Sequence, residues 1–235
     1  MTFVTTAAHM LEVIIKGLAQ PLQLLPGGAV FLPQLQTLLI ADAHFGKAVT
    51  FRRLGVPVPE GTTGGTLERL DLLVAQTGAR QVVFLGDFLH SAWAHAPSTQ
   101  NLLAQWRAVN HALVLTLVRG NHDDRAGDPP AGLGMQVVDE PLMLGDGAAR
   151  LALCHHPQLV PGSYVIAGHW HPCVSLSGTG RDRLRLPCFW FGDQQTRAVG
   201  VLPAFGSFTG MHPINRSKGD RVFAVAGQAV REVPG

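Results

Sequence analysis

The sequence predicts an α/β fold in which two mixed β-sheets pack face to face, with helices on the outside. Continuously apolar segments of strand length alternate with helical patterns in the first half, and β-rich sequence dominates the second half. The chain has 235 residues, of which 46% are hydrophobic and 14% charged. This composition is typical of a globular protein that buries a large core. We expect one domain over residues 1–235.

The first half is expected to contain five strand segments and two helices. The strand segments are 11–17, 21–33 with a turn at 26–28, 36–44, 80–87 and 113–124. A Gly- and Pro-rich loop is expected over 55–65, and a helix over 66–78, whose apolar residues recur at helical spacing until Gly78 stops it. A second helix is expected over 97–112, with Ser98 as a plausible N-cap.

The second half is expected to be almost entirely β. Strand patterns cover 149–157 and 163–172, and the sequence from Cys173 onward reads as hairpins and strands. No apolar run reaches the roughly 20 residues that a membrane helix needs, and the N-terminal segment lacks the features of a signal peptide. The three cysteines have no paired spacing and indicate a reduced, cytoplasmic protein.

Composition also bears on function. A net charge of +2 is not a polyanion-binding signature by itself. The chain has eleven histidines against a single tyrosine, which raises the expectation of metal chemistry, although several of these histidines could simply lie on the surface.

Five predicted buried strands end in the same way, with side chains that bind metals. These residues are Asp42 and His44; Asp87; Asn121, His122 and Asp123; His155 and His156; and His169 and His171. Loops beyond the carboxyl ends of strands in α/β sheets line a common crevice. We therefore expect residues distant in the sequence to converge at one edge.

The residue types favour a dinuclear metal site. Carboxylate, amide oxygen and imidazole suit manganese, iron, cobalt or zinc, and one carboxylate can bridge two cations about 3.5–4 Å apart. Glycines at 86, 120 and 168 would let the backbone turn where ligands bend inward. Behind Gly168, His169 and His171 could then reach different metals.

In order, the motifs D-x-H, G-D, G-N-H-D, H and G-H-x-H resemble those of the calcineurin-like metallophosphoesterase superfamily. The segments "LLIADAHFGKAVTFRRLGVPVPEGTT" and "LPAFGSFTGM" are similar to the bacterial PdeM subgroup, the ligase-associated DNA damage response endonucleases. That likeness runs from about Leu11 to Val230. The resemblance implies a four-layer sandwich, with two mixed β-sheets flanked by helices.

The resemblance also implies two sets of ligands for two divalent ions, Mn²⁺ foremost, with Fe²⁺, Zn²⁺, Co²⁺ and Mg²⁺ as alternatives. One ion would be held by Asp42, His44, Asp87 and His171. The other would be held by Asp87, Asn121, His155 and His169. His156 is the alternative to His155, which the resemblance favours because it directly follows the strand.

The nucleophile is expected to be a metal-bridging hydroxide rather than a side chain. His122 would then be a non-ligand imidazole that stabilises the transition state or protonates the leaving oxygen. Asp123 could orient it. The alternative interpretation of this motif is a turn that carries a surface histidine.

Several other residues could contact a substrate. Lys47, Arg52 and Arg53 follow the first motif and could track phosphates, or they could belong to a solvated loop. Trp93 and Trp170 could stack on bases or serve in packing. The alternating Arg181, Arg183 and Arg185 are typical of a solvent-facing strand.

The resulting functional prediction is a metal-dependent phosphodiesterase, an endonuclease acting on single-stranded DNA in DNA repair. The alternative is a small-molecule phosphodiesterase or pyrophosphatase of the same fold, and a second rival is a non-catalytic scaffold, which should have lost ligands. The resemblance also implies a functional association with a DNA ligase, a helicase and an exonuclease-like protein. No membrane partner is expected.

Overall fold

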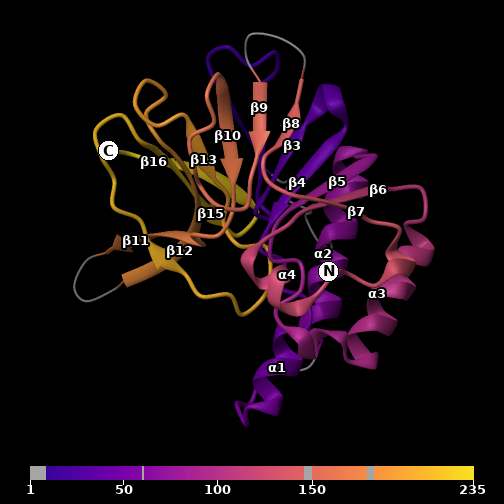
Figure 1. Cartoon of the computed structure of the whole chain (residues 1–235). Helices are drawn as coiled ribbons and strands as arrows, with labels where there is room; N and C mark the ends of the chain where they lie inside the picture. Colours follow the sequence, from indigo (N-terminus) through magenta and orange to yellow (C-terminus); the bar gives the residue numbers. More distant parts are fainter. Residues whose placement is uncertain (1–8, 60, 146–149, 179–182) are drawn as a thin grey trace, which may run out of the picture.

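The computed structural model describes residues 9–59, 61–145, 150–178 and 183–235. Two β-sheets pack against each other, one built from the first half of the chain and one from the second (Figure 1). This confirms the predicted fold class of two mixed sheets flanked by helices.

The first sheet has seven strands in sequence order. They are β1 (Leu11–Val13), β2 (Leu22–Leu25), β3 (Ala29–Leu32), β4 (Thr37–Ala41), β5 (Gln81–Leu85), β6 (Val114–Val118) and β7 (Gln136–Val138). Strands β1 to β4 are antiparallel, whereas β4 to β7 are parallel. The carboxyl ends of β4, β5 and β6 therefore lie at one edge, as the sequence predicted.

Helices connect the parallel strands of this sheet. They are α1 (Lys47–Arg53), α2 (Thr62–Thr77), α3 (Pro97–Val109) and α4 (Asn121–Ala126), with short 3-10 helices η2 (Ala92–His95) and η3 (Ala131–Leu133). A further 3-10 helix, η1 (Pro33–Leu35), joins the antiparallel strands β3 and β4. The side chain of Asp71 on α2 ties α2 to α3, since it accepts hydrogen bonds from Trp106 Nε1 at 2.7 Å and Asn110 Nδ2 at 2.9 Å.

The parallel strands are apolar on both faces, and their alternate residues enter two different cores. Leu38 and Ile40 pack in the core beneath α2 and α3, whereas Leu39 and Ala41 pack between the two sheets. Successive side chains of a strand point to opposite faces. A strand buried on both faces thus reads as a continuous apolar run.

The second sheet has nine strands: β8 (Leu142–Leu144), β9 (Arg150–Leu153), β10 (Ser163–Ala167), β11 (Pro172–Ser177), β12 (Arg183–Phe191), β13 (Val199–Val201), β14 (His212–Pro213), β15 (Arg221–Ala226) and β16 (Ala229–Val233). Strand β10 lies between β9 and β13 and is parallel to both. In this half of the described chain, strands and loops rather than helices cover the outer face, where Cys154, Val165 and Val222 are buried.

Three local predictions were wrong. Thr62–Gly65, expected in a loop, forms the first turn of α2. Ser98 is not the N-cap of its helix, because Ala96 occupies that position and Pro97 begins α3. Helix α4 begins at Asn121, inside the third metal motif and within a segment expected to be strand, and helix α1, close after the first motif, was not predicted either. No helix among the described residues is long and apolar enough to cross a membrane.

Candidate metal centre

The strand ends that carry the predicted ligands have an unusual backbone. Only seven described non-glycine residues have a positive φ, and five of them are predicted ligands: Asp42 (54°), His44 (47°), Asp87 (50°), His169 (70°) and His171 (47°). Side chains make this left-handed conformation unfavourable, and it persists where surrounding contacts enforce it, often at functional sites. Here it turns the chain so that the side chains point into one shared space.

The first predicted ligand set comes together around a buried pair of aspartates. The distance between His171 Nε2 and Asp42 Oδ1 is 3.4 Å. His44 Nε2 lies 3.4 Å from His171 Nε2 and 3.8 Å from Asp87 Oδ2. These short distances link all four donors of this set, although they come from the segments after β4, β5 and β10.

The second predicted set meets at His155 Nε2. This nitrogen lies 3.0 Å from Asn121 Oδ1, 3.0 Å from His169 Nδ1 and 3.5 Å from Asp87 Oδ1. The two oxygens of Asp87 therefore face different donor sets: Oδ2 faces the set of His44 and Oδ1 faces that of His155.

The neighbours of His155 and His156 distinguish these two residues. His155 is fully buried, and its Nδ1 lies 3.0 Å from Leu85 O, which turns Nε2 toward the donors. His156 Nδ1 instead lies 2.9 Å from Glu140 Oε1, and the other oxygen of Glu140 accepts hydrogen bonds from the backbone N–H groups of both histidines. This arrangement favours His155 as the donor, with Glu140 holding the loop.

The donor sets have the spacing that a divalent cation requires. Two ligands at about 2.1 Å from one ion lie about 3.0–3.4 Å apart in octahedral or tetrahedral geometry, which is close to the separations above. Asp42 Oδ1 is buried without a hydrogen-bond partner in the described part of the chain, and a bound cation would compensate such a carboxylate oxygen. Burial is also the main cause that lowers the pKa of His44 and of His169 below the ordinary value. Burial therefore favours the neutral form of both imidazoles, which is the form that binds metals.

Two glycines make the close approach possible. Gly86 has φ +76°, and a Cβ on it would lie 2.1 Å from His155 Nδ1. Gly168 lacks a positive φ, but a Cβ there would lie 2.6 Å from Asp42 Oδ2. Position 168 therefore needs glycine for space rather than for a sharp turn. A Cβ on Gly120 would likewise lie too close to Asp87.

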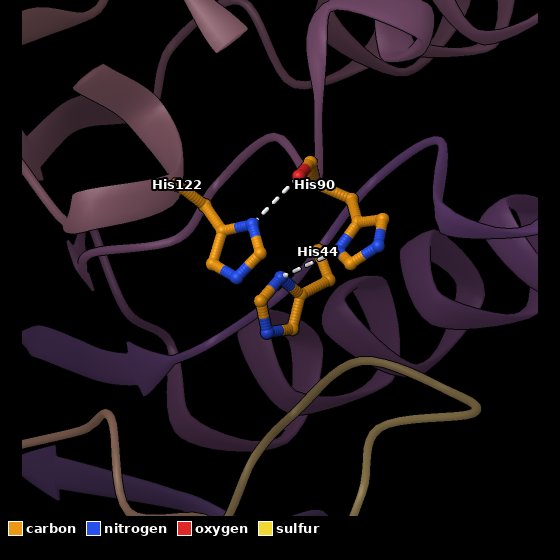
Figure 2. A group of neighbouring side chains, drawn as sticks. All are labelled: His44, His90 and His122. Atoms are coloured by element: carbon orange, nitrogen blue, oxygen red, sulfur yellow. Dashed lines mark hydrogen bonds between the residues drawn. The ribbon is translucent and has the colours of Figure 1, made fainter. Parts of the chain in front are cut away.

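His122 lies at the edge of the donor sets, beside His44 and His90 (Figure 2). Its Nδ1 is 2.7 Å from His90 O, so Nδ1 carries the proton, while Nε2 lies 3.9 Å from Asp87 Oδ2. The expected contact between Asp123 and His122 is not the one observed. The carboxylate of Asp123 accepts hydrogen bonds from the backbone N–H groups of Gly120 and Leu89.

These hydrogen bonds show that Asp123 supports the loops of the site. It is fully buried, and burial raises its pKa to about 6, although its two backbone hydrogen bonds act in the opposite direction. The carboxylate holds the loop after β6 against the loop after β5. The backbone carbonyl of His90 orients His122, and no sequence motif indicates such a contact.

The predicted phosphate-contacting residues lie on α1. Lys47 begins this helix, and its pKa is lowered by burial, while Asp42 and Asp87 counteract that shift. Arg52 and Arg53 are exposed in the last turn, and the guanidinium of Arg53 lies 5.7 Å from the centroid of the Trp93 ring. Arg183 and Arg185 are exposed on β12, and Arg181 lies outside the described residues.

The fold and the donor geometry define an α/β protein with a candidate divalent-metal centre. Among solved structures, the chain is similar to Pseudomonas putida nuclease MPE, with 40% identity, a TM-score of 0.80, and coverage of 96% of this chain and 100% of that one. It is also similar to Yfce, a phosphoesterase from E. coli, with 16% identity, a TM-score of 0.41, and coverage of 84% of this chain and 97% of that one. No family model and no curated protein sequence matches the chain.

The chain belongs to the metallophosphoesterase superfamily. It is a metal-dependent phosphoesterase, a hydrolase.

Proposed function

We propose that this protein is an endonuclease that hydrolyses phosphodiester bonds in single-stranded DNA during DNA repair in the cytoplasm, using two divalent metal ions. The observation that carries the proposal is the position of Asp87, whose two carboxylate oxygens face separate donor sets. The overall similarity to a nuclease supports a nucleic acid as the substrate.

In this proposal the donor residues are assigned to two metal ions according to the contacts described above. One ion is held by Asp42, His44, Asp87 and His171. The other is held by Asp87, Asn121, His155 and His169. Mn²⁺ is the foremost candidate, because mixed carboxylate, amide and imidazole donors suit borderline metals, with Fe²⁺, Zn²⁺, Co²⁺ and Mg²⁺ as alternatives. When bound, such a pair lowers the pKa of water and neutralises charge on the phosphoryl oxygens.

The chain itself supplies the proton for the leaving group. His122 Nδ1 donates to His90 O, which fixes the ring and leaves Nε2 facing the donor sets. A proton on Nε2 can then pass to the oxygen that leaves the phosphorus. Asp123 acts indirectly, because its bonds to the backbone of Gly120 and Leu89 keep His122 at this edge.

Lys47, Arg52 and Arg53 are proposed to bind the DNA backbone. Lys47 lies near Asp42 and Asp87 and is positioned for the phosphate closest to the metals. The two arginines extend this basic surface along α1. Guanidinium groups bind phosphate oxygens bidentately and contribute salt-dependent affinity. Functional association with a DNA ligase, a helicase and an exonuclease-like protein is part of the same proposal.

The decisive experiment compares Asp87→Ala with Asp139→Ala, a matched change at a side chain that is 93% exposed. Metal content is measured by mass spectrometry, and cleavage of labelled single- and double-stranded DNA is measured with Mn²⁺, Mg²⁺ or chelator. We expect Asp87→Ala to lose both metals and all cleavage, and Asp139→Ala to resemble the unmodified protein. Two retained metals with near-normal turnover in Asp87→Ala would contradict the shared-carboxylate assignment. If cyclic nucleotides, assayed in parallel, were cleaved but DNA was not, the proposed DNA substrate would be wrong.

A further inference from the structure

A cavity of about 440 Å³ opens directly beside the candidate metal centre, on the side of the second sheet. His169, one of the proposed metal donors, forms part of its wall. His212 forms another part, and its ring centroid lies 6.1 Å from that of His171. The cavity therefore adjoins donors from both sets, so a group bound in it could belong to the same nucleotide chain as a phosphate bound at the metals.

Two tryptophans form part of the cavity wall. Trp170, which lies between the two donor histidines in the sequence, is 43% exposed although it is a large apolar side chain. Its ring centroid lies 5.4 Å from that of Trp190, which is 3% exposed. Trp170 thus contacts a buried partner and contributes exposed surface to the cavity.

A buried carboxylate fixes the wall behind Trp170. Asp220 accepts a hydrogen bond from Trp190 Nε1 at 3.1 Å and another from Arg197 Nη2 at 2.7 Å. The guanidinium of Arg197 lies 5.2 Å from the centroid of the Trp190 ring. Two planar groups, the Trp190 ring and the Arg197 guanidinium, are therefore held in place before any ligand arrives, and preorganised surfaces lose less entropy on binding.

The remaining lining gives the cavity a mixed character that suits a nucleobase. Ile214 and Pro213 add apolar surface, while Asn215 and His212 offer polar groups that can hydrogen-bond to a base edge. None of the described lining residues is acidic, so a neighbouring phosphate is not repelled. A volume of this size falls within the usual range for small-molecule sites.

We propose that this cavity is a nucleobase subsite, in which Trp170 stacks on the base of a nucleotide next to the scissile phosphate. The inference rests on the proposed function and specifies how the substrate is held. Every base has a π face, and stacking on aromatic side chains tolerates any sequence. The subsite thus selects for an unpaired base, because a base within a duplex has both faces covered. It provides a physical reason for preferring single-stranded over double-stranded DNA.

The test uses an end-labelled single-stranded oligonucleotide that carries one abasic residue, cut by the protein with Mn²⁺ and resolved at each linkage. Removing the base should suppress cleavage at one fixed offset from the abasic residue by about 5–150-fold, which corresponds to 1–3 kcal/mol for one stacked base. In Trp170→Ala, the intact oligonucleotide should be cut more slowly at that same linkage, so that removing the base no longer changes the rate there. Trp170→Phe should recover part of the difference between the intact and abasic substrates. Leu72→Ala, at a side chain that is 61% exposed on α2, should show the same difference as the unmodified protein.

A merely structural role for Trp170 would lower the rate at all linkages equally and keep the abasic effect, which would overturn the proposal. So would the absence of any fixed-offset effect in the unmodified protein. A binding measurement in chelator separates this proposal from the nuclease activity. There the unmodified protein should bind a short oligothymidylate more tightly than the corresponding abasic chain, and Trp170→Ala should lose that preference. If no DNA is cleaved but the preference is present, the subsite stands and the proposed reaction fails; if the preference is absent, the subsite fails.

Discussion

Replacing Gly86 by alanine tests the close packing between the loop after β5 and the donor His155. The new methyl group would lie 2.1 Å from His155 Nδ1 and 2.4 Å from its Cγ. A normal non-bonded contact is about 3.5 Å, so the ring or the loop must shift by about 1 Å or more. His155 is fully buried and cannot move into solvent.

The expected cost has two origins. A left-handed backbone conformation with a Cβ costs about 1–2 kcal/mol, and overpacking a closed site costs about 1–3 kcal/mol. Together they predict a loss of about 2–5 kcal/mol in the free energy of unfolding of the metal-free protein, measured by urea denaturation. Ligand distances in metal sites usually lie within about 0.2 Å of their standard values. We therefore expect the second proposed ion to be lost, so that metal content falls from two equivalents to one.

Gly64→Ala is the matched control. Gly64 lies in α2 without a positive φ, and a methyl group added there would meet no atom within 4 Å. Alanine at this position should increase stability by up to about 1 kcal/mol, because glycine is a poor helix former. If Gly86→Ala retained two metal equivalents and unmodified stability, the deduced packing of His155 against this loop would be wrong.

Three further results are expected. His122→Ala should keep both metals and lose about 10²–10⁴-fold in oligonucleotide turnover. The loss should be smaller on bis-p-nitrophenyl phosphate, because its leaving group needs no proton. Loss of metal would instead show that His122 is a ligand. Replacing Arg52 and Arg53 by glutamine should weaken oligonucleotide binding. The slope of log binding constant against log salt concentration should become shallower by about 0.7 per lost phosphate contact. The control Arg80→Gln, at the opposite end of β5, should change neither the affinity nor this slope. The three cysteines are fully buried, and burial raises their pKa values, so a thiol reagent should label them only after unfolding; rapid labelling of the native protein would contradict this environment.

Six of the seven strands of the first sheet could be predicted because their physical signal is strong, whereas the short edge strand β7 was not predicted. The run from Thr37 to Ala41 is buried at every position, and such a run is typical of a strand covered on both faces. The direction of the strands then followed from the α/β pattern, and with it the convergence of the residues after β4, β5 and β6.

The helical features that were missed lack such a signal. The glycines at 64 and 65 indicated a loop, since each costs about 1 kcal/mol in a helix, but packing of the buried Leu67, Leu70 and Leu73 stabilises the whole of α2. Helix α1 has only two buried residues, Ala48 and Thr50, so it shows no clear apolar stripe. Its contacts with η2 support it instead.

The candidate donors could be selected from the sequence, and the structure brings their side chains together, whereas the contacts that support them could not be predicted. The hydrogen bonds that Glu140 accepts from the loop of His155, and that His90 O accepts from His122, involve either a lone glutamate or a backbone atom. Neither leaves a motif in the sequence. The wall of the aromatic cavity was missed for a related reason, because Trp190, Arg197 and Asp220 follow the last metal motif and meet only through the second sheet.

The proposed metal donors are divided between the two halves of the chain. Those up to Asn121 extend from the first sheet, and the three histidines from His155 onward extend from the second. During synthesis, a growing chain that ends before His171 has emerged cannot hold a complete site, however well its first sheet has folded. Hydrolytic activity therefore becomes available only after the two sheets have packed together. On the proposed assignment of the donors, a chain whose second sheet is incomplete has no activity, so a measurement of hydrolysis also measures how many chains have completed folding.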